Sequence, residues 1–290
     1  MMLLTRRLSK ARSSRLALSL AFSKQASSSS AASAVHLDIG MSSQPHPRKT
    51  NGGEDAGFFA QTPQSTAFGV ADGVSAACDD GLYARRLADS AAELSTSISC
   101  PHDLLAAAWK SVSALDGRST ACFGTIDGII DGGRPRLRVS NLGDSRCWVL
   151  RARGPSAKLG IAASTTPQLW EFNCPYQIGK LAGVELNTPA DASTSEVDLV
   201  PGDVVLVATD GLFDVLHPLE CLELVAGSLR TDAPAAAIAA SLVDTAITLS
   251  KDSSRRSPVM IAFEREGYVA RGRELQDDVT VVVARVSSAS

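Results

Sequence analysis

The chain has 290 residues, a formal net charge of −3 and 44% apolar residues. This length and apolar content suffice for one large hydrophobic core, so we expect one domain of about 240 residues preceded by a leader. The charge gives no indication of nucleic-acid binding. No apolar run reaches the roughly 18 residues that a membrane-spanning helix needs.

The first 37 residues differ in composition from the rest. They are rich in serine and lack acids, since the first acidic residue is Asp38. Their basic residues are Arg6, Arg7, Lys10, Arg12, Arg15 and Lys24. This composition is typical of an organelle transit peptide, the alternative being a disordered tail. We predict a leader over 1–37, a linker over 38–49 and a globular domain over 50–290; arginines close to the start favour the mitochondrion over the plastid.

The six cysteines form no C-x-x-C pair, which argues against a zinc ribbon. A domain of this size needs no disulfides, and the leader is not of a secretory type. We therefore expect reduced thiols that lie mostly in the core.

Hydrophobic periodicity predicts a mixture of strands and helices. In chain order, the expected elements are strands at 54–60 and 66–71, helices at 81–97 and 101–115, strands at 120–126, 136–140, 147–150 and 203–209, helices at 218–226 and 234–250, and a last strand at 279–286. Gly143-Asp144-Ser145 is expected to form a hairpin turn, and residues 155–190 an irregular segment. The order predicts an α+β fold, a β-sandwich with pairs of helices packed outside its sheets.

Acidic residues stand at the ends of several predicted strands. Asp72 and Asp210 each end an apolar run and precede a glycine, Asp277-Asp278 precede the last strand, and Glu54-Asp55 begin the first. Asp-Gly alone is a weak signal, because it occurs six times and most copies are typical of turns. Converging carboxylates without basic partners would repel one another, however, and a divalent cation would relieve that repulsion. Oxygen ligands favour Mg²⁺ or Mn²⁺, while the four scattered histidines make zinc unfavourable.

Five short segments then carry a resemblance to a known family. They are Gly53-Glu54-Asp55-Ala56, Val70-Ala71-Asp72-Gly73-Val74, Asn141-Leu142-Gly143-Asp144-Ser145, Ala208-Thr209-Asp210-Gly211-Leu212-Phe213-Asp214 and Asp277-Asp278-Val279-Thr280. In this order they resemble the metal-dependent type 2C serine/threonine protein phosphatases, over about residues 50–286. Arg118–Cys122, Phe172–Pro175 and Asp277-Asp278 resemble the compact branch that includes the T-cell-activation phosphatase homologue and plant organellar relatives.

The resemblance implies a four-layer αββα catalytic domain that hydrolyses phosphoserine or phosphothreonine in proteins. A water activated by two Mg²⁺ or Mn²⁺ ions would attack phosphorus, without a phosphoenzyme. The implied metal ligands are Glu54, Asp72, Gly73, Asp210 and Asp277, with Asp72 bridging the ions and Asp72, Asp210 and Asp277 as the catalytic set. Asp55 and Asp278 would lie behind these ligands and orient waters. Asp144 would lie near a weaker, third metal-binding position. We expect a monomer whose partners are phosphoprotein substrates.

Two positions depart from the family pattern. Val74 stands where many members have a histidine as the proposed acid, so the acid is unassigned. Arg48 and Lys49 lie near, but not at, the spacing of the family's phosphate-binding arginine. Either could bind phosphate; the alternative is a solvated linker charge.

Three further interpretations are weighed against this one. The missing histidine leaves open an inactive phosphatase fold that serves as a binding module. Cys147 and Arg153 have the spacing of a cysteine phosphatase, but the residues between them are typical of a strand. Trp170, Phe172 and Tyr176 indicate either a flap over the site or a loop held to the core by its aromatic residues.

Overall fold

The structure is a computed structural model that describes residues 35–49, 52–74, 81–127, 134–154, 158–268 and 277–288. These residues belong to one compact unit, Ala32–Ser290. The predicted leader lies outside the described residues except for 35–37. Within the described helices, none combines the length and apolarity needed to cross a bilayer.

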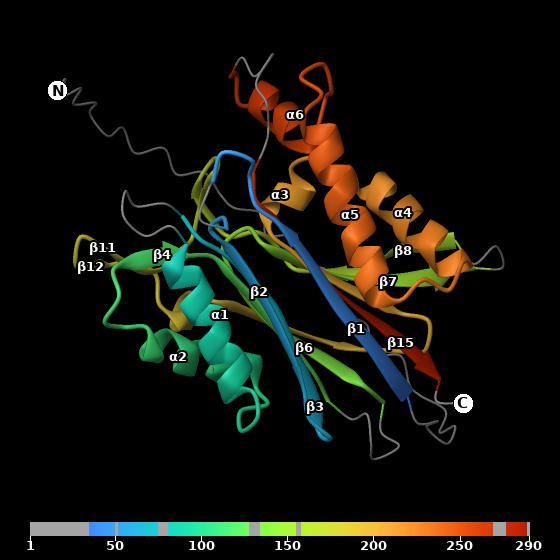
Figure 1. Cartoon of the computed structure of the whole chain (residues 1–290), viewed down its shortest axis with the longest axis horizontal. Helices are drawn as coiled ribbons and strands as arrows, with labels where there is room; N and C mark the ends of the chain where they lie inside the picture. Colours follow the sequence, from blue (N-terminus) through green and yellow to red (C-terminus); the bar gives the residue numbers. More distant parts are fainter. Residues whose placement is uncertain are drawn as a thin grey trace, which may run out of the picture. The chain divides into compact units, whose positions relative to one another are not determined.

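Two five-stranded antiparallel sheets form the centre of this unit (Figure 1). Sheet A has the order β1 (Val35–Gln44), β15 (Val279–Ser288), β14 (Val204–Ala208), β7 (Arg146–Arg153) and β8 (Lys158–Ser164). Sheet B has the order β13 (Ser193–Asp198), β6 (Arg136–Leu142), β5 (Ala121–Asp127), β3 (Ser65–Asp72) and β2 (Asp55–Gln61). There are two smaller sheets. One has the order β12 (Val184–Glu185), β11 (Ile178–Leu181) and β4 (Gly117–Ser119), and the other pairs β9 (Leu169–Glu171) with β10 (Cys174–Pro175).

Three apolar clusters hold four layers together. The central cluster lies between the sheets and joins residues such as Phe68 and Val70 of sheet B to Val205 and Val282 of sheet A. A second cluster packs α1 (Leu82–Leu94) and α2 (Pro101–Ser111) on the outer face of sheet B. The third packs α3 (Asp210–Phe213), α4 (Pro218–Arg230) and α5 (Ala235–Ser250) on the outer face of sheet A. The predicted αββα sandwich is therefore confirmed.

The helices follow from the spacing of their apolar residues. In α1, Tyr83, Leu87 and Ala91 lie on one face and are buried against sheet B. Pro101 occupies the first turn of α2, where its missing N–H costs no hydrogen bond. All four predicted helices are present, and α6 (Pro258–Arg265), which was not predicted, begins after the cap Ser257, whose Oγ accepts from the Met260 N–H.

A strand lies over the last residues of the predicted leader and the first part of the linker predicted over 38–49. Residues 35–44 form β1, which pairs along its whole length with β15, from Val35 opposite Ser288 to Gln44 opposite Val279. The buried side chains of Val35 and Leu37 contribute to the central core. Polar residues such as His36, Ser42 and Ser43 interrupt the apolar pattern of this edge strand and conceal it in the sequence.

The hairpin predicted around Gly143-Asp144-Ser145 is wrong. β6 pairs with β5 and β13 in sheet B, whereas β7 pairs with β14 and β8 in sheet A. The three residues therefore carry the chain from one sheet to the other. Gly143 has φ 101°, and a Cβ there would lie 2.8 Å from the Thr120 side chain, so the crossing requires glycine.

Residues 155–190 are less irregular than predicted. Those described include β8, β9, β10, β11 and β12, most of them very short, followed by the 3₁₀ turn Pro189–Asp191. Cys147 and Arg153 both lie in β7, which excludes the phosphate-binding loop of a cysteine phosphatase. The cysteines of the described segments (100, 122, 147, 174 and 221) are free thiols, as expected.

Candidate metal centre

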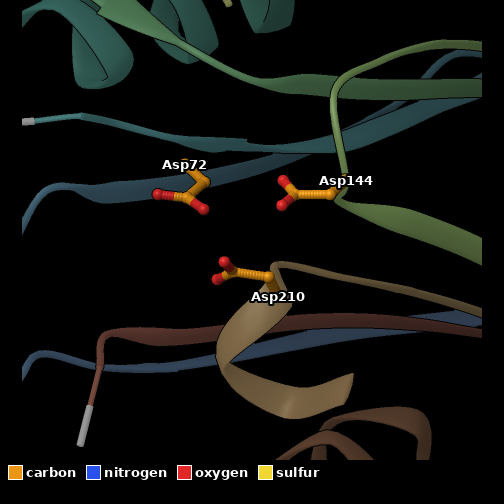
Figure 2. A group of neighbouring side chains, drawn as sticks. All are labelled: Asp72, Asp144 and Asp210. Atoms are coloured by element: carbon orange, nitrogen blue, oxygen red, sulfur yellow. The ribbon is translucent and has the colours of Figure 1, made fainter. Parts of the chain in front are cut away.

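Three carboxylates meet where the two sheets adjoin. Asp72 is the last residue of β3, Asp144 lies in the crossing between β6 and β7, and Asp210 is the first residue of α3, directly after β14. Each offers an oxygen, and these oxygens lie within 4.8 Å of one another. Figure 2 shows the three side chains pointing toward a common space from separate segments. We call them the aspartate trio.

Hydroxyl groups tie the backbone of the trio together. The Ser119 Oγ and the Thr120 N–H both donate to the Asp72 carbonyl, each at 2.9 Å. The Thr120 hydroxyl is also 2.8 Å from that of Ser145, the neighbour of Asp144. These hydrogen bonds connect the end of β3 to the crossing, so the positions of Asp72 and Asp144 are fixed relative to each other.

The electrostatics of the trio favour a cation. Burial, followed by the charge of Asp210, raises the pKa of Asp72 well above its ordinary value. Burial, followed by the charge of Asp144, raises the pKa of Asp210 to about 6. Burial also raises the pKa of Asp144, and its Oδ1 is buried without a hydrogen-bond partner among the described residues. Closely placed carboxylates with unused lone pairs fit a hard divalent cation such as Mg²⁺ or Mn²⁺.

A second group of acids borders the trio. Asp278 is buried, and its carboxylate accepts from the N–H groups of His46 (2.6 Å), Glu54 (2.5 Å) and Asp55 (3.3 Å). Burial acts to raise the pKa of Asp278, but these donors and the Lys49 ammonium together hold it below its ordinary value. The buried Asp55 carboxylate accepts from the Thr209 hydroxyl at 2.8 Å. Asp278 and Asp55 thus fix the segment that carries Glu54 against the segments that carry Asp210 and Asp277.

Asp277 and Glu54 are near the trio but outside the 4.8 Å group. The charge of Asp277 is one of the smaller causes that raise the pKa of Asp72. Burial and the charge of Asp210 raise the pKa of Asp277 itself to about 6, although its carboxylate retains 57% exposure. The acids predicted for the site therefore gather in one region. Asp144, which the resemblance placed at the margin, is one of the three in direct proximity.

Lys49 contacts acids rather than solvent. Its ammonium lies 2.5 Å from Glu54, 2.9 Å from Asp278 and 3.8 Å from Asp277, and its side chain is 30% exposed. The alternative of a solvated linker charge is therefore wrong for Lys49. The Arg48 N–H donates to the His46 ring at 3.0 Å.

The glycines after Asp72 and Asp210 allow close approach of the backbone. The Gly73 N–H donates to the Glu54 carbonyl at 3.2 Å, and a Cβ on Gly73 would lie 2.5 Å from that oxygen. A Cβ on Gly211 would overlap the Asp278 carbonyl. Both Asp-Gly pairs therefore bring acid-bearing segments together. Val74 donates its N–H to the Arg118 carbonyl at 3.0 Å and offers no side-chain acid.

Arg146 is the site residue that sequence reasoning missed. It stands two positions after Asp144, and its guanidinium lies 5.0 Å from the centre of the Phe213 ring. Its charge lowers the pKa values of Asp144 and Asp210 against the stronger effect of burial. Its closeness to Asp144 in the sequence was the one available signal.

An αββα sandwich with converging carboxylates at strand ends indicates a metal-dependent hydrolase. Comparison with known proteins specifies the family. Residues 62–287 match the family described as Stage II sporulation protein E (SpoIIE). The chain is 30% identical to Probable protein phosphatase 2C 26 of Arabidopsis thaliana, over 88% of this chain and 85% of that protein. It is 32% identical to Protein phosphatase PTC7 homolog fig of Drosophila mojavensis, over 81% of this chain and 78% of that protein.

Solved structures agree with this relationship. The photosystem II phosphatase PBCP superposes with a TM-score of 0.74 at 26% identity, over 88% of this chain and 100% of that one. The catalytic domain of the serine threonine protein phosphatase PstP, in complex with two manganese ions, has the same fold with a TM-score of 0.57 at 17% identity, over 87% and 99%. The chain spans half the length of another relative, Probable protein phosphatase 2C 55 of Arabidopsis thaliana, at 31% identity over 84% of this chain. The chain belongs to the type 2C family of metal-dependent serine/threonine protein phosphatases.

Proposed function

We propose that this site hydrolyses phosphoserine and phosphothreonine in proteins with two Mg²⁺ or Mn²⁺ ions held by Asp72, Asp210, Asp277, Glu54 and the Gly73 carbonyl. The observation that carries the proposal is the convergence of Asp72, Asp144 and Asp210 within 4.8 Å. The bound ions would supply an activated water and neutralise charge on the phosphoryl oxygens. Asp144 is proposed to hold a further, weaker ion at the same place.

The remaining acids are proposed to position the metal ligands. The Asp278 carboxylate accepts from the N–H groups of His46 and Glu54, and the Asp55 carboxylate accepts from Thr209, so these contacts hold Glu54 near the trio. Lys49 orients Glu54 through its ion pair. Outer contacts of this kind set the direction of ligand oxygens and affect metal affinity. Arg48 and Lys49 remain proposed phosphate contacts.

Substitution of Asp72 by asparagine tests the proposal. The exchange removes one negative charge from the trio at nearly constant volume. We expect Mn²⁺-dependent hydrolysis of a phosphothreonine peptide to fall by at least about 100-fold, because a direct ligand matters more than the outer contacts that affect activity 10- to 100-fold. Asp116→Asn, at an exposed aspartate that also precedes a glycine, is the matched control and keeps wild-type activity.

The same assay decides between enzyme and binding module. Wild-type hydrolysis that requires Mn²⁺ or Mg²⁺ and stops with EDTA supports the enzyme. A wild-type protein that binds the phosphopeptide without hydrolysing it, with either metal, would establish the inactive alternative.

We further propose that the leader directs the protein to the mitochondrion, with the plastid as the alternative. The basic, acid-free composition before residue 35 supports an organelle, and the relatives include a phosphatase named for photosystem II. A fluorescent fusion that carries residues 1–34 should enter the organelle, and Arg6→Glu with Arg7→Glu should leave it in the cytosol. We also propose a monomer, since one chain supplies the whole trio; light scattering tests this.

A further inference from the structure

A pocket of about 170 Å³ opens beside the aspartate trio. Asp144 belongs to the trio and also lines the pocket, so the pocket adjoins the trio. The other walls come from the segment 167–173, from α3 and from α6. No residue of the proposed metal set other than Asp144 faces this pocket.

Apolar side chains form most of its lining. They are Leu169 and Phe172 on the first wall, Phe213 on the second, and Val259 and Ala262 on the third. The charged residues of the lining are Asp144, Arg146 and Asp214. Arg146 lies over the Phe213 ring, and its Nε is buried without a hydrogen-bond partner among the described residues. The pocket therefore has a mostly apolar lining with three charged residues, of which Asp144 is shared with the trio.

Contacts outside the lining hold the walls in place. Phe172 packs edge-on against Phe263 of α6, with ring centres 5.0 Å apart, and stacks on Tyr268 at 5.8 Å. The Val259 N–H donates to the Asp214 carbonyl at 3.2 Å, which ties α6 to α3. The segment 167–173 is thus held by its aromatic residue while also forming a wall beside the site. A preformed apolar pocket loses little free energy on ordering when a ligand enters.

We propose that this pocket receives a large apolar side chain of the phosphoprotein substrate, from a residue within two positions of the phosphorylated one. The inference rests on the proposed function, because the phosphoryl group must lie at the trio. Neighbouring residues of an extended peptide are about 3.3 Å apart along the chain, so a side chain two positions away reaches the adjoining space. A charged side chain of either sign would lose hydration against the apolar walls, and it would also meet a like charge in the lining, Asp144 and Asp214 for an acid or Arg146 for a base.

The test compares phosphothreonine peptides that differ at a single flanking position. Leucine, alanine, aspartate and lysine are placed in turn at each position within two residues of the phosphothreonine. We expect kcat/KM with Mn²⁺ to be about tenfold higher for leucine than for alanine at one position. The reason is that extra methylene groups bound in an apolar pocket raise kcat/KM by about this factor. Aspartate and lysine should not exceed alanine there.

Filling the pocket should remove this preference. Ala262→Phe places a ring in the interior, so the ratio of kcat/KM between the leucine and alanine peptides should fall to about one. Ala237→Phe, on the exposed face of α5, is the matched control and keeps the preference. Leu169→Asp provides a second variant at a position that is 42% exposed, where folding is not at risk, and should also reduce the leucine preference.

The outcomes separate the two proposals. A wild-type enzyme that hydrolyses all the peptides equally, or prefers aspartate or lysine, overturns the pocket assignment and leaves the phosphatase intact. A leucine preference that survives both Ala262→Phe and Leu169→Asp also overturns it. Absence of metal-dependent hydrolysis for every peptide overturns the proposed function and this inference with it.

Discussion

Lys49 has an unusual position for a cation near a metal site. Its ammonium contacts Glu54 and Asp278, and it lies 3.8 Å from Asp277. A positive charge at this place offsets part of the repulsion among acids that border the trio. Lys49 therefore stabilises the protein most when no ion is bound.

Substitution of Lys49 by methionine should expose this role. In EDTA we expect the free energy of unfolding to fall by about 1–3 kcal/mol, between the values for exposed and buried ion pairs. Added Mn²⁺ should then raise the melting temperature more in the variant than in the wild type, because the ion replaces the lost charge. Calorimetry with and without Mn²⁺ measures both quantities. Lys158→Met, on the exposed start of β8, is the control, and an equal Mn²⁺ effect in all three proteins would refute the role.

The raised pKa values of the acids predict an unusual pH dependence for the metal-free protein. Asp210 and Asp277 have pKa values raised from 3.8 to about 6 by burial and by neighbouring acids. An acid with a higher pKa in the folded state binds its proton more tightly when folded, so these groups lower the stability as pH rises from about 4 through about 6. In EDTA we expect a lower melting temperature at pH 7.5 than at pH 5.5. With saturating Mn²⁺ the trend should reverse, since the ion binds the deprotonated acids; a metal-free melting temperature that rises over this range would contradict the assignment.

At the scale of elements, the edge strand β1 completes sheet A. It pairs with all ten residues of β15, and the Asp38 carboxylate accepts from the Ala235 N–H at 2.8 Å, at the start of α5. Gly40 lies so close to Ala236 that a Cβ would overlap its backbone. β1 thus joins the last strand to the helix layer, and a protein without it would expose the edge of β15.

Truncation tests the importance of this strand. A chain starting at residue 33 should melt like the full-length protein. A chain starting at residue 45 should melt at least about 10 °C lower, because losing several buried residues exceeds the 1 kcal/mol that shifts the melting temperature by about 2–4 °C in a domain of this size. Thermal unfolding followed by circular dichroism distinguishes the two, and equal melting temperatures would show that β1 is dispensable.

Some elements could be predicted from the sequence and others could not, for a physical reason. The central strands β3, β14 and β15 are buried on both faces and so read as nearly continuous apolar runs, while the helices α1 and α5 bury one face and show helical spacing. The acids of the site were found because each ends or begins such a strand. β1 was missed since polar residues interrupt its apolar pattern, and the path of Gly143-Asp144-Ser145 was misjudged because pairing partners depend on distant residues. The pocket residues Arg146 and Ala262 meet only through the tertiary fold.

At the scale of the whole domain, the trio joins the two sheets. Asp72 ends a strand of sheet B, Asp210 follows a strand of sheet A, and Asp144 lies between the sheets in the chain. An ion bound there therefore connects both halves of the sandwich. Metal binding should act on the folding of the whole domain rather than on one loop.

Hydrogen exchange can measure this coupling. With Mn²⁺ we expect slower exchange in the last residues of both β3 and β14, because opening either sheet would release the ion. The Asp72→Asn variant should lose protection in both strands together. Slower exchange in only one of the two sheets would show that the ion does not bridge them.

The ion pair between Lys49 and Glu54 has a consequence for biogenesis. In a newly made chain, the Lys49 ammonium already compensates part of the negative charge of the acids that border the trio. The sandwich can consequently close before any manganese or magnesium arrives, and loading follows as a separate, later event. In a compartment poor in free metal, the protein would then be folded but inactive. It would become active when Mg²⁺ or Mn²⁺ binds.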